Sequence, residues 1–176
     1  MKTLAITAAI ALAATSAWAQ SAAESSGVNS LAGIPPKTQD FVTEAASSDM
    51  FEIESSKLAL ERGDEAVKSF AQQMITDHQK TSDELKQMVQ GGAVEATIPT
   101  AMTSAHQEML DDLKGLQGAE FTEEYMSAQE DAHEDAVDLF KRYGEEGDNA
   151  ELKAWAAKTA PALEHHLKMV EDMNDG

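Results

Sequence analysis

Apolar residues recur at intervals of three and four positions over four long stretches of the chain, which is the spacing of one face of an amphipathic α-helix. The first stretch begins at Thr38, which we expect to cap its helix, and continues to about Arg62. The others run from residue 65 to Gly91, from about 119 to 144, and from 149 to 173. No stretch shows the sustained alternation that indicates a β-strand. The pattern therefore predicts an all-α protein.

The connections between these stretches predict how the helices are arranged. Gly63 and Asp64 join the first two helices and residues 144–149 join the last two, so each pair must return as an antiparallel hairpin. Residues 92–117 form a longer crossover, in which we expect a short amphipathic helix. Its apolar residues, which should cover the core, are Met109, Leu110, Leu113 and Leu116. Two hairpins joined by one long crossover are the topology of a ferritin-like four-helix bundle, here over residues 38–173.

The N-terminal residues have the pattern of an export signal. Lys2 precedes a short apolar run, and Ala17-Trp18-Ala19 places small residues where a signal peptidase cleaves. We therefore expect a signal peptide over residues 1–19, a flexible leader over residues 20–37, and a periplasmic or secreted protein. The apolar run is too short for a membrane span, and no later segment approaches the roughly 20 apolar residues that a span needs.

The composition limits the partners of the protein. Among its 176 residues 32 are acidic and 13 are basic, so the net charge at pH 7 is −19. Such a surface repels phosphate backbones and anionic lipids, and we therefore expect no nucleic-acid partner. The chain has no cysteine, so neither a disulfide nor a lipid-anchored cysteine is available. The sequence identifies no protein partner.

Polar residues within the apolar faces carry the candidate chemistry. His78, His133 and His166 lie near the middle of three predicted helices, and Glu52 lies near the middle of the remaining one. Glu130 precedes His133 by three positions, which is the spacing of the Glu-x-x-His pairs of di-iron bundles. A histidine in such a face needs a hydrogen bond, a carboxylate or a metal, because an unpaired polar group there costs about 1–3 kcal/mol. These five residues form the predicted metal site.

Two other readings of the same faces stay open. The histidines can form a hydrogen-bonded core that fixes the register of the helices. The partners available for such a core are Glu52, Ser48, Thr81, Thr159 and trapped water. Methionines near the histidines offer a thioether-rich Cu(I) site, although methionine at helical spacing is typical of ordinary core packing. These are Met74, Met126, Met169 and Met173. We expect His106 and His165 to be exposed.

Short motifs are spread through all four predicted helices. In the first half they are Phe41-Val42, Ala45-Ala46, Glu52, Lys68-Ser69-Phe70-Ala71, Met74 and Asp77-His78. In the second half they are Gly118, Phe121, Tyr125-Met126, His133, Ala156-Ala157-Lys158-Thr159, Pro161 and His166-Leu167. This set resembles the bacterial exported family called domain of unknown function 4142, over about residues 38–173. The resemblance implies a ferritin-like fold, and it implies no particular activity because the family is defined by similarity.

The chain departs from a complete di-iron site. Such a site takes a glutamate from each of two helices and a Glu-x-x-His pair from each of the other two. The fourth helix has Leu163 where the second pair would have its glutamate. Asp77 and His78 lie about 100° apart on their helix, so they cannot both point inward. The remaining histidine-rich set suits zinc, copper or iron, whereas magnesium and calcium prefer oxygen ligands.

Three functions are compatible with these patterns. We expect an exported, non-enzymatic bundle that binds a metal ion or acts in envelope stress through its cluster of histidine and glutamate. A metal-dependent oxidase or peroxidase-like enzyme is the second hypothesis. The third is a structural or partner-binding envelope protein with a hydrogen-bonded histidine core. The sequence identifies neither a substrate nor the metal.

Overall fold

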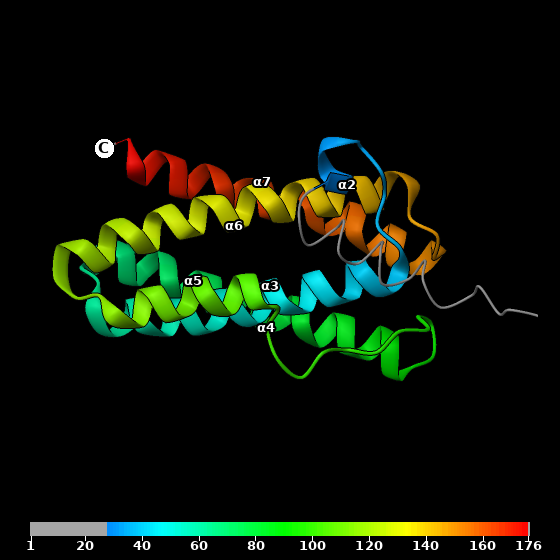
Figure 1. Cartoon of the computed structure of the whole chain (residues 1–176), viewed down its shortest axis with the longest axis horizontal. Coiled ribbons are helices and arrows are strands. Elements are labelled where there is room, and N and C mark those ends of the chain that lie inside the picture. The colour runs from blue at the N-terminus through cyan, green and yellow to red at the C-terminus, as the bar shows by residue number, and fades with distance from the viewer. Residues whose placement is uncertain (1–27, 176) are drawn as a thin grey trace, which may run out of the picture.

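The computed structural model describes residues 28–175, and every regular element in this part of the chain is a helix. The elements are α2 (Val28–Leu31), α3 (Thr38–Arg62), α4 (Glu65–Gln90), α5 (Ser104–Gly115), α6 (Gly118–Glu146) and α7 (Ala150–Asn174). The long helices α3, α4, α6 and α7 run along the long axis of the molecule (Figure 1). The predicted all-α bundle is confirmed, whereas the predicted signal peptide over residues 1–19 lies outside the described residues.

Short polar turns close the two hairpins, as predicted. The side chain of Asp64 accepts hydrogen bonds from the backbone amides of Ala66 and Val67, both at 3.0 Å, and so caps α4. Asn149 caps α7 by accepting from the amide of Leu152 at 2.9 Å. The expectation that Thr38 caps α3 is wrong, because Thr38 is already the first helical residue and the cap position before it makes no side-chain hydrogen bond.

The crossover between the hairpins runs the length of the bundle. Near its start, Gln39 at the beginning of α3 donates to the carbonyl of Thr97 at 2.9 Å. Near its end, Arg62 at the end of α3 donates to the carbonyl of Leu113 at 3.0 Å. The chain therefore passes from one end of α3 to the other before α6 begins, which makes α4 and α6 run in the same direction. Leu113 of α5 is fully buried, as the amphipathic pattern of the crossover predicts.

The core is divided into three layers along the bundle axis. Two apolar clusters occupy the ends, one around Phe41 and Trp155 and the other around Phe51 and Phe121. In each long helix, buried polar residues lie at or beside the boundary between the two clusters. We call these residues the polar layer: Asp49, Glu52, His78, Gln129, His133 and His166. The four helices thus bring polar groups to one level of an otherwise apolar core.

The described part of the predicted leader contacts α6. Ser30 in α2 donates to a carboxylate oxygen of Asp138 at 2.7 Å, and Arg142 donates to the carbonyl of Ile34 at 2.6 Å. Flexibility of the leader as a whole stays a prediction, since its first part lies outside the described residues. Across residues 28–175, no helix combines the length and the apolar character that crossing a membrane requires.

Candidate metal centre

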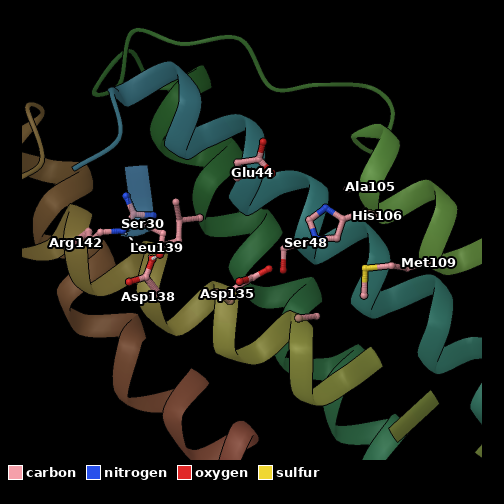
Figure 2. A pocket seen from close by; sticks show the side chains of 12 residues that line it. Ser30, Glu44, Ser48, Ala105, His106, Met109, Asp135, Asp138, Leu139 and Arg142 are labelled. Carbon is pink, nitrogen blue, oxygen red and sulfur yellow. Dashed lines mark hydrogen bonds and ion pairs between the residues drawn. The ribbon is translucent and has the colours of Figure 1, made fainter. Parts of the chain in front are cut away.

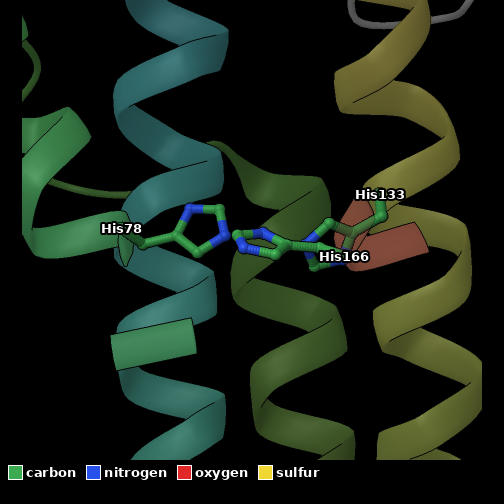
Figure 3. A group of neighbouring side chains, drawn as sticks. All are labelled: His78, His133 and His166. Carbon is green, nitrogen blue, oxygen red and sulfur yellow. The ribbon is translucent and has the colours of Figure 1, made fainter. Parts of the chain in front are cut away.

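Three histidines from three helices meet in the polar layer. His78 comes from α4, His133 from α6 and His166 from α7, and Figure 3 shows their rings converging. One ring nitrogen of each lies within 4.8 Å of those of the other two. The three side chains belong to residues that are 1–3% exposed. A tetrahedral metal with nitrogen ligands needs nitrogen separations of about 3.3 Å, so small side-chain movements would complete the site.

His78 is fixed by a carboxylate of α3. Its Nδ1 donates to Oδ1 of Asp49 at 2.8 Å, and Asp49 is itself held by the hydroxyls of Thr81 at 2.8 Å and Ser82 at 3.1 Å. The Nε2 of His78 is buried and has no hydrogen-bond partner among the described residues. In the neutral form of His78 the outer nitrogen carries the proton, so the lone pair of the inner nitrogen is available for a ligand.

The other two histidines repeat this arrangement with different acceptors. His133 donates from Nδ1 to the backbone carbonyl of Gln129 at 2.8 Å, and its Nε2 is buried without a partner in the described chain. His166 donates from Nε2 to Oδ2 of Asp77 at 3.1 Å, and its Nδ1 is likewise buried without a described partner. Each ring therefore anchors one nitrogen to an oxygen and leaves the other unpaired, as metal-ligating histidines do.

Glu52 adds a buried carboxylate to the layer. Glu52 is 1% exposed, and neither of its carboxylate oxygens has a hydrogen-bond partner among the described residues. Its Oε1 lies 3.8 Å from Nδ1 of His133. Burial raises the pKa of Glu52 to about 7, and the positive charge of His78 opposes this rise. A buried carboxylate gains free energy from a nearby cation, so Glu52 suits a charge partner of a bound metal.

The histidines differ in how readily they take a proton. Burial lowers the pKa of His133 to about 3 and that of His166 to about 4, and the charge of His78 lowers both further. Burial also lowers the pKa of His78, but its hydrogen bond to Asp49 and the charge of Glu52 outweigh burial and raise it overall. His133 and His166 are therefore neutral and ready to bind a metal at neutral pH, whereas a metal at His78 competes with a proton.

The structure brings four of the five predicted site residues together and places the fifth elsewhere. Glu130 is half-buried, and its Oε2 accepts a hydrogen bond from Asn174 at 2.5 Å. The inward position one turn before His133 belongs to Gln129, which is fully buried. Gln129 lies four residues before His133, and Glu130 lies three residues before it. The helix rotates by about 100° per residue, and this rotation turns Glu130 away from the layer. A Glu-x-x-His pair is therefore not assembled at His133.

Sequence reasoning missed the groups that orient the histidines. Asp49 precedes Glu52 by one helical turn, and this spacing was the available signal for it. Asp77 and His78 were not expected to point inward together, yet the carboxylate of Asp77 reaches the buried His166 on the neighbouring helix. His106 was expected to be exposed but is half-buried, with Nδ1 2.7 Å from the hydroxyl of Ser47, and burial lowers its pKa to about 4.

The fold and this site define an all-α bundle with a buried cluster of three histidines. The family described as "Domain of unknown function (DUF4142)" matches residues 15–173, and the chain therefore belongs to this family, as the motifs predicted. Among solved structures, one described as "CopM in the Cu(II)-bound form" is similar with a TM-score of 0.66 and 18% sequence identity, over 80% of this chain and 97% of that chain. At this identity the likeness concerns the fold alone. No curated protein matches the chain.

Proposed function

We propose that this protein binds one transition-metal ion, with copper favoured, through His78, His133 and His166. The observation that carries the proposal is a set of three buried ring nitrogens that lack partners within residues 28–175, while the opposite nitrogen of each ring is held by an oxygen. Burying unpaired polar atoms costs free energy, and a shared metal removes that cost at all three.

The donor set supports this choice of metal. Imidazole ligands suit copper and zinc, and copper(II) binds nitrogen and oxygen sites more tightly than the other divalent first-row metals do. The similar structure is described as containing Cu(II), which supports copper for a bundle of this shape. Zinc and iron accept the same residues, so the experiment below includes all three metals.

We further propose that the protein acts outside the cytoplasm as a metal-binding protein during metal stress in the cell envelope. The signal-like pattern over residues 1–19 and the net charge of −19 support this, because an acidic surface attracts cations. An oxidase with two metals finds less support. It needs two Glu-x-x-His pairs, and the described residues contain one group of three metal-ligand side chains.

Metal titration of the purified, untagged protein and its variants tests the proposal. We expect the wild type to bind one equivalent of Cu(II), and His78→Ala, His133→Ala and His166→Ala each to lose more than about 100-fold in affinity, because the site then lacks one of three protein ligands. Competition titrations against chelators with Cu(II), Zn(II) and Fe(II) measure these affinities.

His106→Ala is the matched control for these variants. It removes a half-buried histidine outside the layer, so its unfolding free energy should fall while its metal affinity stays at the wild-type value. If all four variants bound metal as tightly as the wild type, the surface carboxylates would be the binding groups and the proposal would be wrong.

A further inference from the structure

A cavity between α4 and α7 leads to the histidines from one side of the bundle. It has a volume of about 210 Å³, and every residue that lines it comes from these two helices. His78 and His166 are among them, together with the exposed residues His165 and Ala162. The cavity therefore joins the surface of the molecule to two of the three candidate ligands.

The interface between α4 and α7 is also the most open side of the bundle. The backbones of α3 and α4, of α6 and α7, and of α3 and α6 approach closely, whereas those of α4 and α7 do so only sparsely. Polar side chains bridge this gap. His166 bonds to Asp77 at 3.1 Å, and the indole nitrogen of Trp155 donates to Glu84 at 2.7 Å. Such bridges tolerate water between the helices, which an apolar seam excludes.

The other neighbouring helices are packed more closely. Between α6 and α7, a Cβ placed on Gly144 would lie 3.0 Å from the backbone of Ala157, so these helices leave little space between them near their connection. Between α3 and α6, Ser56 and Tyr125 share a buried hydrogen bond of 2.9 Å. The backbones of these helix pairs therefore lie closer together than those of α4 and α7.

A second cavity, of about 150 Å³, does not serve the histidine cluster. It lies where α3, α5 and α6 meet, and Figure 2 shows His106, Ser48 and Asp135 around it. None of the three clustered histidines lines it. Its rim includes Ala105, which is exposed as Ala162 is at the rim of the first cavity. The two cavities thus form a natural pair for comparison.

We propose that the metal ion enters and leaves the three-histidine site through the cavity between α4 and α7. The inference rests on the proposed function and adds a route and its lining residues. Asp77 is suited to receive the ion first, because its side chain is 41% exposed while its Oδ2 contacts His166. The charges at the rim are balanced by Lys80 and Lys158 against Asp77 and Glu84. The route is therefore defined by the volume of the cavity and not by a net charge at its rim.

The absence of cysteine from the chain allows a direct test. Ala162→Cys introduces a single thiol at the rim of the cavity, which a bulky thiol reagent attached through a disulfide can block after the protein has folded. The probe is Zn(II), because the reductant that later removes the reagent would reduce Cu(II). Stopped-flow mixing measures Zn(II) uptake, and mixing with excess chelator measures its release.

Blocking the passage should slow uptake and release alike, by about tenfold or more, with the dissociation constant unchanged, since a plug raises the barrier in both directions. Reductant should restore both rates. Ala105→Cys, blocked in the same way at the other cavity, should bind and release Zn(II) at the rate of the unblocked protein.

Two results would contradict the proposal that the ion passes through this cavity. One is equal rates before and after blocking at Ala162→Cys. The other is equal slowing at Ala105→Cys. A changed dissociation constant with only one rate affected would also count against it, because the label would then act on the site itself. Absence of any Zn(II) or Cu(II) binding by the unblocked protein would instead refute the proposed function, so the two failures are distinguishable.

Discussion

The polar layer and the apolar cluster beside it use the same helices in opposite ways. Around Phe41 the rings are fully packed, with Tyr143 stacked at 4.2 Å and Phe140 edge-on at 4.9 Å between ring centroids. The polar layer is equally buried, yet it contains carboxylate and imidazole atoms without partners among the described residues. Burial of the apolar cluster stabilises the fold, whereas burial of the unpaired polar atoms costs free energy. A bound metal, as proposed above, would offset that cost.

The largest effect is expected in the cluster. Phe41→Ala should lower the free energy of unfolding by about 3–5 kcal/mol, because it removes a fully buried ring from a packed environment. Denaturant unfolding measures this change. Cu(II) affinity of the variant, measured at a temperature where it is folded, should equal that of the wild type. A joint loss of stability and affinity would show that the two regions are not separate.

His133→Leu makes the opposite change in the layer. It replaces a buried ring whose Nε2 has no described partner with an apolar side chain, so the metal-free protein should be as stable as the wild type or more stable. Its metal affinity should fall more than about 100-fold. Unfolding with and without Cu(II) separates the two effects. A strongly destabilised metal-free variant would indicate that the histidine supports the fold by itself.

The pH dependence of Glu52 sharpens the contrast. Its pKa is about 7 in the folded protein and 4.5 is the ordinary value, so its favourable contribution is complete below pH 4.5 and is lost as the pH rises through 7. Glu52→Gln removes the titrating group. In metal-free protein, the unfolding free energy of this variant should therefore rise relative to that of the wild type by on the order of 2–3 kcal/mol between pH 4.5 and 8. Unfolding curves at both pH values measure this. If the two proteins differed in unfolding free energy by the same amount at both pH values, the raised pKa of Glu52 would be contradicted.

The smallest of these effects is expected at the carboxylate behind His78. Asp49→Asn keeps the size of the side chain but removes the charge that orients the imidazole, so metal affinity should fall about 10–100-fold. Chelator competition measures the loss. Asp138→Asn, a carboxylate of α6 outside the polar layer, is the control and should leave the affinity unchanged. Equal affinity of Asp49→Asn and wild type would mean that packing alone holds His78 in place.

The sequence by itself determined the helices, because their signals are local. The first helix ends at Arg62, as predicted, and begins at Thr38, the residue that was expected to be its cap. The spacing of apolar residues, the short turns within each hairpin and the long segment between the hairpins depend on neighbouring residues along the chain. The same periodicity placed His78, His133 and His166 on inward faces, where all three are found.

Only the tertiary structure decided which residues of the polar layer contact one another. A rotation of one residue, about 100° around the helix, separates the inward Gln129 from the outward Glu130, and the apolar pattern does not resolve it. Asp77 orients a histidine on another helix, and the sequence contains no signal for that pairing. The cavity between α4 and α7 likewise depends on the distance between two packed backbones. The local sequence determines helix periodicity, whereas contacts between helices depend on how the helices pack.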